Sequence, residues 1–150
     1  TKGDIIPPQY VAADAVVDRS IIGEGTEIYG EVHNSVIGAG VTVKKGAVIR
    51  DSIIMKQSVI GENDVIDKAI IAENVTVGDN VVMGIGEDTP NREKPNVYSF
   101  GLVTVGENTV IPSNVKIGKN TAVVGETVPE DYPGGVLESG ETLNKEGETE

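Results

Sequence analysis

His33, the single histidine of the chain, has the clearest potential for chemistry. Imidazole titrates near neutral pH, so this side chain could act as a general base toward a hydroxyl or an amine. A single imidazole cannot supply the three histidine ligands of a His₃ catalytic metal site. The surrounding segment Gly-Glu-Val-His-Asn-Ser favours a structural position for His33, and the sequence predicts no catalytic residue.

The second chemical candidate is a basic cluster of Lys44, Lys45 and Arg50, which could hold the phosphate group of an effector. A solvated face on which these cations pair with nearby acids is the more ordinary interpretation. The glycine clusters Gly84–Gly86 and Gly134–Gly135 lack a following helix and a basic residue in place, so they are weak phosphate cradles. We therefore predict no cofactor-binding or metal-binding residue.

The composition limits the function classes. The chain has 150 residues, a net charge of −12 and no cysteine. Its charge would repel a phosphate backbone, which argues against a nucleic-acid partner, and the lack of cysteine excludes thiol chemistry and cysteine-based zinc sites. No apolar run has the length of a membrane span. We expect a cytoplasmic protein with no membrane or nucleic-acid partner.

The elements that must position these residues follow from a six-residue repeat. The chain has 23 Val and 16 Ile against 3 Leu, a balance that favours strands over helices. A four-residue pattern recurs in register along the chain. It consists of an aliphatic residue, then Gly or Ala, then any residue, and then Gly or Asn. The clearest copies begin at Ile22, Ile37, Ile60, Ile71, Val77, Val105 and Ile117.

The spacing predicts three short strands in each turn of a coil that forms a triangular prism. Links of six, six and five residues give the 17-residue recurrence of Ser52 and Ala69. One aliphatic residue per repeat, such as Ile60 or Ile66, should point inward and stack on its copy in the next coil. The Gly or Asn three residues later should adopt the positive φ that a tight corner needs. The fold class is therefore all-β, with about six coils.

The register also predicts the domain organisation. Residues 1–10, which contain the pair Pro7–Pro8, should be a linker from the preceding part of a longer chain, and residues 11–137 the β-helix. A loop insertion at 84–101 interrupts the repeat, and its Tyr98 and Phe100 are possible subunit contacts. Residues 138–150, rich in Glu, should be an acidic, disordered tail.

The repeat over Val11–Val128 resembles the hexapeptide-repeat family, whose fold is a left-handed parallel β-helix. Segments Pro7–Val41, Tyr98–Pro112 and Glu130–Leu137 are similar to the C-terminal domain of the bacterial glucose-1-phosphate adenylyltransferase (ADP-glucose pyrophosphorylase) family of glycogen biosynthesis. The resemblance implies a nucleotidyltransferase parent that uses ATP, glucose 1-phosphate and Mg²⁺.

In that family, catalysis takes place in an N-terminal nucleotide-binding domain, whose Gly-rich, Arg-containing phosphate loop has no counterpart here. Two family positions with effector-binding arginines fall on Glu107 and near Gly140, neither of which is basic. The resemblance therefore implies that residues 1–10 are a linker from a missing N-terminal catalytic domain. We expect the rest of the chain to be a structural and oligomerisation domain that is inactive by itself and binds no cofactor. The alternatives are a stand-alone hexapeptide acyltransferase with His33 as base and a non-catalytic paralogous subunit of the same pathway.

Family members assemble as tetramers partly through these domains, so we expect this chain to self-associate, at least as a side-by-side dimer. The flat faces of the prism should carry aliphatic residues outside the inward column, such as Val82, Ile85 and Val103 near the loop. An apolar strip of this kind, with Phe100 beside it, would form the contact.

Overall fold

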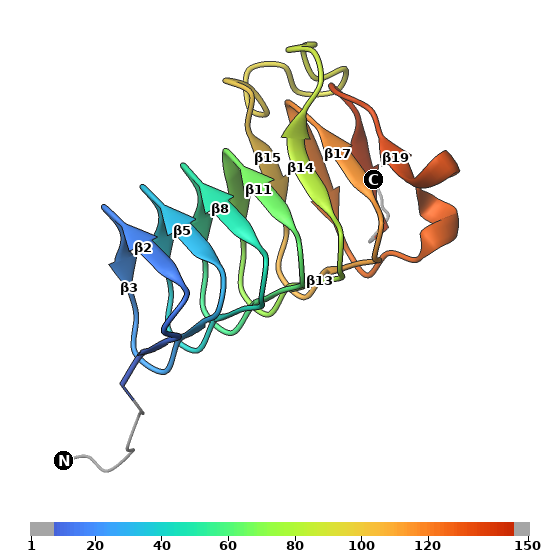
Figure 1. Cartoon of the computed structure of the whole chain (residues 1–150). Helices are drawn as coiled ribbons and strands as arrows, with labels where there is room; N and C mark the ends of the chain where they lie inside the picture. Colours follow the sequence, from blue (N-terminus) through green and yellow to red (C-terminus); the bar gives the residue numbers. More distant parts are fainter. Residues whose placement is uncertain (1–7, 146–150) are drawn as a thin grey trace, which may run out of the picture.

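The structure, a computed structural model, describes residues 8–145 of the chain. These residues form a three-sided prism of short parallel strands wound into a continuous coil (Figure 1). The predicted all-β fold and the three strands per turn are confirmed. The left-handed sense of the coil stays a prediction.

Each side of the prism is one parallel sheet. Sheet A contains β1 (Tyr10–Val11), β4 (Glu27–Ile28), β7 (Thr42–Val43), β10 (Val59–Ile60), β13 (Thr76–Val77) and β16 (Val110–Ile111). Sheet B contains β2 (Val16–Asp18), β5 (Glu31–His33), β8 (Val48–Arg50), β11 (Val65–Asp67), β14 (Val82–Ile85), β17 (Lys116–Gly118) and β19 (Val136–Leu137). Sheet C contains β3 (Ile21–Ile22), β6 (Val36–Ile37), β9 (Ile53–Ile54), β12 (Ala69–Ile71), β15 (Val103–Val105), β18 (Thr121–Val124) and β20 (Thr142–Asn144).

The core is the predicted inward column of aliphatic side chains. Ile49, Ile66 and Met83 are fully buried, and they follow one another across β8, β11 and β14. The other buried members are Ile28, Val32, Ile37, Val43, Ile54, Ile60, Ile71, Val77, Val105, Ile111, Ile117 and Val123. Because β-branched residues pack well on a pleated surface, Ile or Val fills the narrow interior in most strands.

The corners also have the predicted conformation. The Gly and Asn residues assigned to them have φ between 57° and 70°, in the left-handed region. They are Gly25, Gly40, Asn63, Asn74, Asn80, Asn108 and Asn120. Most side chains carry a steric cost at such φ values, which Gly avoids and Asn tolerates. This requirement explains why the repeat keeps Gly or Asn at this position.

The C-terminal end corrects the predicted tail. Residues 138–145 are ordered, because β20 pairs with β18 and Leu143 packs against the core. The prediction of a disordered segment from residue 138 is therefore wrong up to residue 145, and residues 146–150 lie outside the described part. This segment adds one layer to the six predicted.

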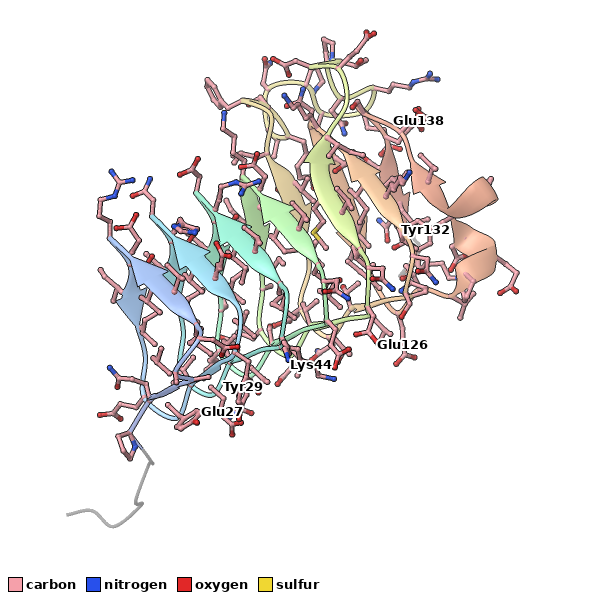
Figure 2. The ribbon with its side chains drawn as sticks, in the orientation of Figure 1. Glu27, Tyr29, Lys44, Glu126, Tyr132 and Glu138 are labelled. Atoms are coloured by element: carbon pink, nitrogen blue, oxygen red, sulfur yellow. The ribbon has the colours of Figure 1, made fainter. Side chains whose placement is uncertain are left out.

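Sheet A has no strand in this last layer. The 3₁₀ turns η1 (Pro129–Asp131) and η2 (Pro133–Gly135) take its place there. Tyr132 lies between them and is buried (Figure 2). Its hydroxyl lies 3.1 Å from Thr127 Oγ1, and burial raises its pKa above the ordinary value. The aromatic ring closes the core at this end of the prism.

At the other end, β1 begins at Tyr10, one residue before the predicted start of the β-helix. The predicted linker over 1–10 lies mostly outside the described residues. A loop connects β14, which continues to Ile85, with β15, and it overlaps the range 84–101 that was predicted as an insertion. The loop leaves the prism at the corner between sheets B and C (Figure 1).

Candidate interaction surface

The loop between β14 and β15 is held firmly against the last coils. The buried Asn91 donates through Nδ2 to the carbonyl oxygen of Asn120 at 2.9 Å, and its Oδ1 accepts the backbone N–H groups of Glu93 and Lys94. Asn120 is also buried, and its Oδ1 accepts the Gly101 N–H at 2.8 Å. The loop is therefore fixed at both Asn91 and Gly101.

Of the two predicted contact residues, Phe100 is the more accessible. Its side chain is 85% exposed, whereas Tyr98 is partly buried. Phe100 also has a φ of 61°, an unusual conformation for a bulky residue. A fixed loop thus presents an exposed aromatic ring, which suits a contact residue.

The outward face of sheet C carries an apolar ladder, here called the sheet C stripe, formed by Ile21, Val36, Ile53 and Ile70. These residues are register neighbours on β3, β6, β9 and β12. Ile21 is 69%, Val36 43% and Ile53 42% exposed, and Ile70 is partly buried. Such a contiguous apolar ladder is typical of an interaction site.

Phe100 borders this stripe. Together with Leu102 it lines an open groove of about 420 Å³ whose other wall includes Val36, Ile53 and Lys68. The loop and the stripe therefore form one continuous surface, although they are distant in the sequence.

The exposed aliphatic residues differ in part from those predicted. Val103 is fully buried, so its prediction as a surface residue is wrong. It is the register partner of Ala69 and Thr121, two buried residues directly after a corner. Val82 is half-buried, and Ile85 is exposed on sheet B rather than in the stripe.

His33 lies at the end of β5 on sheet B, in an acidic setting. Its Nε2 is 3.0 Å from Glu31 Oε1, and its Nδ1 is 3.7 Å from Asp18 Oδ2. Asp18 and Arg50 are its register neighbours on β2 and β8. His33 thus belongs to a ladder of alternating polar and charged side chains, which supports the structural interpretation.

The structure spreads the basic candidates over two corners of one coil. Lys44 and Lys45 lie at the corner before β8, and Lys44 projects from the edge of the prism (Figure 2). Arg50 lies at the opposite end of β8, between His33 and Asp67 in the register. All three side chains are exposed, and β8 separates the lysines from the arginine.

Asp64 is a buried carboxylate that was not among the predicted site residues. It occupies the position directly after a corner, where other coils bury Val, Ala, Ser or Thr. Its Oδ2 accepts the Gly61 N–H at 2.7 Å, and its Oδ1 accepts the Val81 N–H of the next coil at 2.8 Å. Desolvation outweighs these bonds and raises its pKa to about 7. In the sequence, Asp64 stands at a repeat position where other coils have Val, Ala, Ser or Thr. This departure from the repeat is the one signal that could have identified Asp64 as a buried carboxylate.

Among residues 8–145, no group of three or more His, Asp or Glu side chains is arranged to hold a metal ion. Within the same range, no helix is long and apolar enough to span a membrane.

Three parallel sheets, an inward Ile/Val column and left-handed Gly/Asn corners define a hexapeptide-repeat β-helix. The family model described as "GlmU-like, C-terminal hexapeptide" matches residues 8–105, and the chain belongs to this family.

Several curated relatives are named glucose-1-phosphate adenylyltransferase. The protein from Lachnospira eligens is 66% identical over 148 residues, which cover 99% of this chain and 35% of the relative. The Acetivibrio thermocellus protein is 47% identical over 150 residues, which cover 100% of this chain and 35% of the relative. The Thermotoga maritima protein is 56% identical over 141 residues, 94% of this chain and 33% of the relative. The chain thus spans about a third of the length of these relatives.

Proposed function

We propose that this chain is the non-catalytic scaffold and assembly domain of a glucose-1-phosphate adenylyltransferase. The similarity to the Lachnospira eligens protein, along nearly the whole chain but only 35% of the relative, carries this proposal. The rest of the parent protein would bind ATP, glucose 1-phosphate and Mg²⁺ and catalyse the transfer. We also infer a cytoplasmic location, where ATP and sugar phosphates are available.

The surface chemistry supports a scaffold role. Transfer between phosphate-bearing substrates needs positive groups that stabilise the phosphate oxygens, whereas this chain has a net charge of −12. Its basic candidates Lys44, Lys45 and Arg50 lie at two separate corners. The prominent accessible features are instead the apolar sheet C stripe and Phe100. Self-association and contact with the catalytic part of the parent are the functions that such features serve.

The purified chain should fold but form no ADP-glucose from ATP, glucose 1-phosphate and Mg²⁺. A coupled assay of pyrophosphate release checks this, with the full-length Lachnospira eligens enzyme as the positive control. Turnover by the chain above that of a mock purification would contradict the scaffold assignment. The acyltransferase alternative has no support from the surroundings of His33, whose nitrogens face Glu31 and Asp18.

A further inference from the structure

We propose that Tyr10, Glu27 and Tyr29, on the first coils of sheet A, form a binding site for the pyranose rings of a neutral glucose oligosaccharide. These three residues are here called the tyrosine site. The inference goes beyond the proposed scaffold function and does not depend on it.

The site begins with two aromatic rings that lie outside the core. Aromatic residues are scarce in this chain, which has four Tyr, one Phe and no Trp. Tyr132 is 2% exposed and closes the core at the opposite end of the prism, whereas Tyr10 is 54% and Tyr29 36% exposed. The ring centroids of Tyr10 and Tyr29 lie 5.7 Å apart, with the ring planes tilted by 48°. The two rings therefore present apolar surface to solvent side by side.

The backbone and one side-chain hydrogen bond hold this arrangement in place. Tyr10 on β1 and Glu27 on β4 are register neighbours on the outward face of sheet A. Tyr29 directly follows β4, and its backbone N–H donates to the carbonyl oxygen of Val43 at 2.8 Å. Its hydroxyl donates to Glu27 Oε1 at 2.9 Å (Figure 2). The ring and the carboxylate are thus in position before a ligand binds, which lowers the entropic cost of binding.

Two hollows meet at the Tyr29 ring. The first has a volume of about 350 Å³ and is lined by Pro8, Tyr10, Gly25, Glu27 and Tyr29. The second has a volume of about 220 Å³, and its lining includes Tyr29, Glu31 and Lys45. Sites for small molecules are concave, with apolar surface and a few polar groups that fix the orientation of the ligand. Two adjoining hollows of this kind fit successive units of one chain molecule.

The polar groups around the rings carry charges of both signs. Glu27 and Glu31 supply carboxylates and Lys45 an ammonium group, and all three residues are exposed. A carboxylate only accepts hydrogen bonds, and an ammonium group only donates them. A hydroxyl group does both, so a ligand with many hydroxyl groups can pair with every one of these side chains.

Glucose also matches the aromatic rings. Its ring substituents are mostly equatorial, so both faces of the pyranose ring consist of C–H groups, while the hydroxyl groups lie at the edge. Packing such a face on Tyr10 or Tyr29 buries apolar surface, and the hydroxyl groups at the edge stay within reach of polar side chains.

The same charges disfavour an ionic ligand. The carboxylates of Glu27 and Glu31 repel a phosphate group, and so does the net charge of −12. A cation could bind to the tyrosine rings, but Lys45 lies in the adjoining hollow. Lys44 follows Val43, the register neighbour of Ile28, and so lies one coil beyond Tyr29. A neutral ligand therefore fits the site better than either kind of ion.

The test is a titration of the ¹⁵N-labelled 150-residue chain, followed by NMR, with maltotriose and separately with cellotriose. These trisaccharides contain the same glucose units in α and β linkage, so the titrations show which linkage the site takes. At least one should shift the amide signals of Tyr10, Glu27 and Tyr29. Because the hollows are open to solvent, we expect a dissociation constant on the order of 1 mM.

Substitutions of Tyr29 separate the ring from the hydroxyl. Tyr29→Ala should weaken binding at least about tenfold, and Tyr10→Ala should weaken it as well. Tyr29→Phe keeps the ring and loses only the hydrogen bond to Glu27, so binding should weaken no more than about threefold. Phe100→Ala is the matched control, because it removes an exposed ring outside the site and should leave the dissociation constant unchanged within about threefold. Unchanged denaturation midpoints would verify that the variants fold.

The proposal is overturned if neither trisaccharide shifts these signals at about 10 mM, or if both alanine variants bind as tightly as the parent chain. Larger shifts at the same amides with inorganic phosphate or tetramethylammonium would also overturn it, and would indicate an anion or a cation site. Each of these results leaves the scaffold role standing, because that role is tested by the formation of ADP-glucose.

Discussion

Ile66→Ala should lower the free energy of unfolding by about 3 kcal/mol. Ile66 is fully buried, with Ile49 and Met83 as its register neighbours in the adjacent coils. Truncation removes apolar contacts and leaves a cavity. The surrounding strands cannot close it, because each is hydrogen-bonded at a fixed spacing to the coils on both sides. Urea denaturation followed by circular dichroism measures the change.

The control for this variant is Glu62→Ala, at an exposed corner of the same coil. It should change the stability by less than about 0.5 kcal/mol. Equal denaturation midpoints for the two variants would contradict the assignment of Ile66 to the inward column.

Asp64 should make the stability of the chain fall as the pH rises through the weakly acidic range. Its pKa is raised from 3.8 to about 7 in the folded state, chiefly by desolvation. The folded state therefore binds the proton more tightly than the unfolded state. Below about pH 4 the Asp64 carboxyl is protonated in both states, so its ionisation does not lower the free energy of unfolding. Above about pH 7 it is charged in both states, and the folded chain carries the full cost of a buried charge.

One pKa unit corresponds to about 1.4 kcal/mol, so the full cost is about 4 kcal/mol. Asp64→Ser is a suitable comparison, because Ser58 at the equivalent corner accepts the N–H of Val75 through its hydroxyl. Between pH 5.5 and pH 8, the parent chain should lose about 2 kcal/mol relative to the Asp64→Ser variant. Urea denaturation of the two proteins at each pH measures this difference. A difference in the free energy of unfolding that stays constant over this pH range would contradict the raised pKa of Asp64.

The coil itself could be predicted from the sequence because its constraints are local and repeated. One residue in each repeat must be a buried aliphatic, most often Ile or Val, to fill the interior, and a corner residue must tolerate positive φ, as Asn74 and Gly40 do. These requirements recur at each turn, so even imperfect copies reveal the register.

The remaining features depend on single residues that depart from the repeat. Leu143 and Thr142 form a strand inside a Glu-rich segment, and the composition concealed it. Val103 directly follows the inserted loop, and its register with Ala69 emerges only once the loop is closed by Asn91 and Asn120. The sheet C stripe was visible in the sequence only through the 17-residue recurrence of Ser52 and Ala69. The residue after each of them, Ile53 or Ile70, belongs to the outward face of sheet C.

Site-specific cross-linking tests most directly whether the chain is an assembly domain that uses the sheet C stripe. The chain has no cysteine, so a single introduced thiol is unique. Ile53 lies within the stripe and is exposed, whereas Lys116 is an exposed residue on sheet B. With a short bismaleimide reagent, Ile53→Cys chains should give a cross-linked dimer and Lys116→Cys chains should give little. Equal cross-linking of the two variants, or cross-linking of neither, would contradict assembly through the stripe.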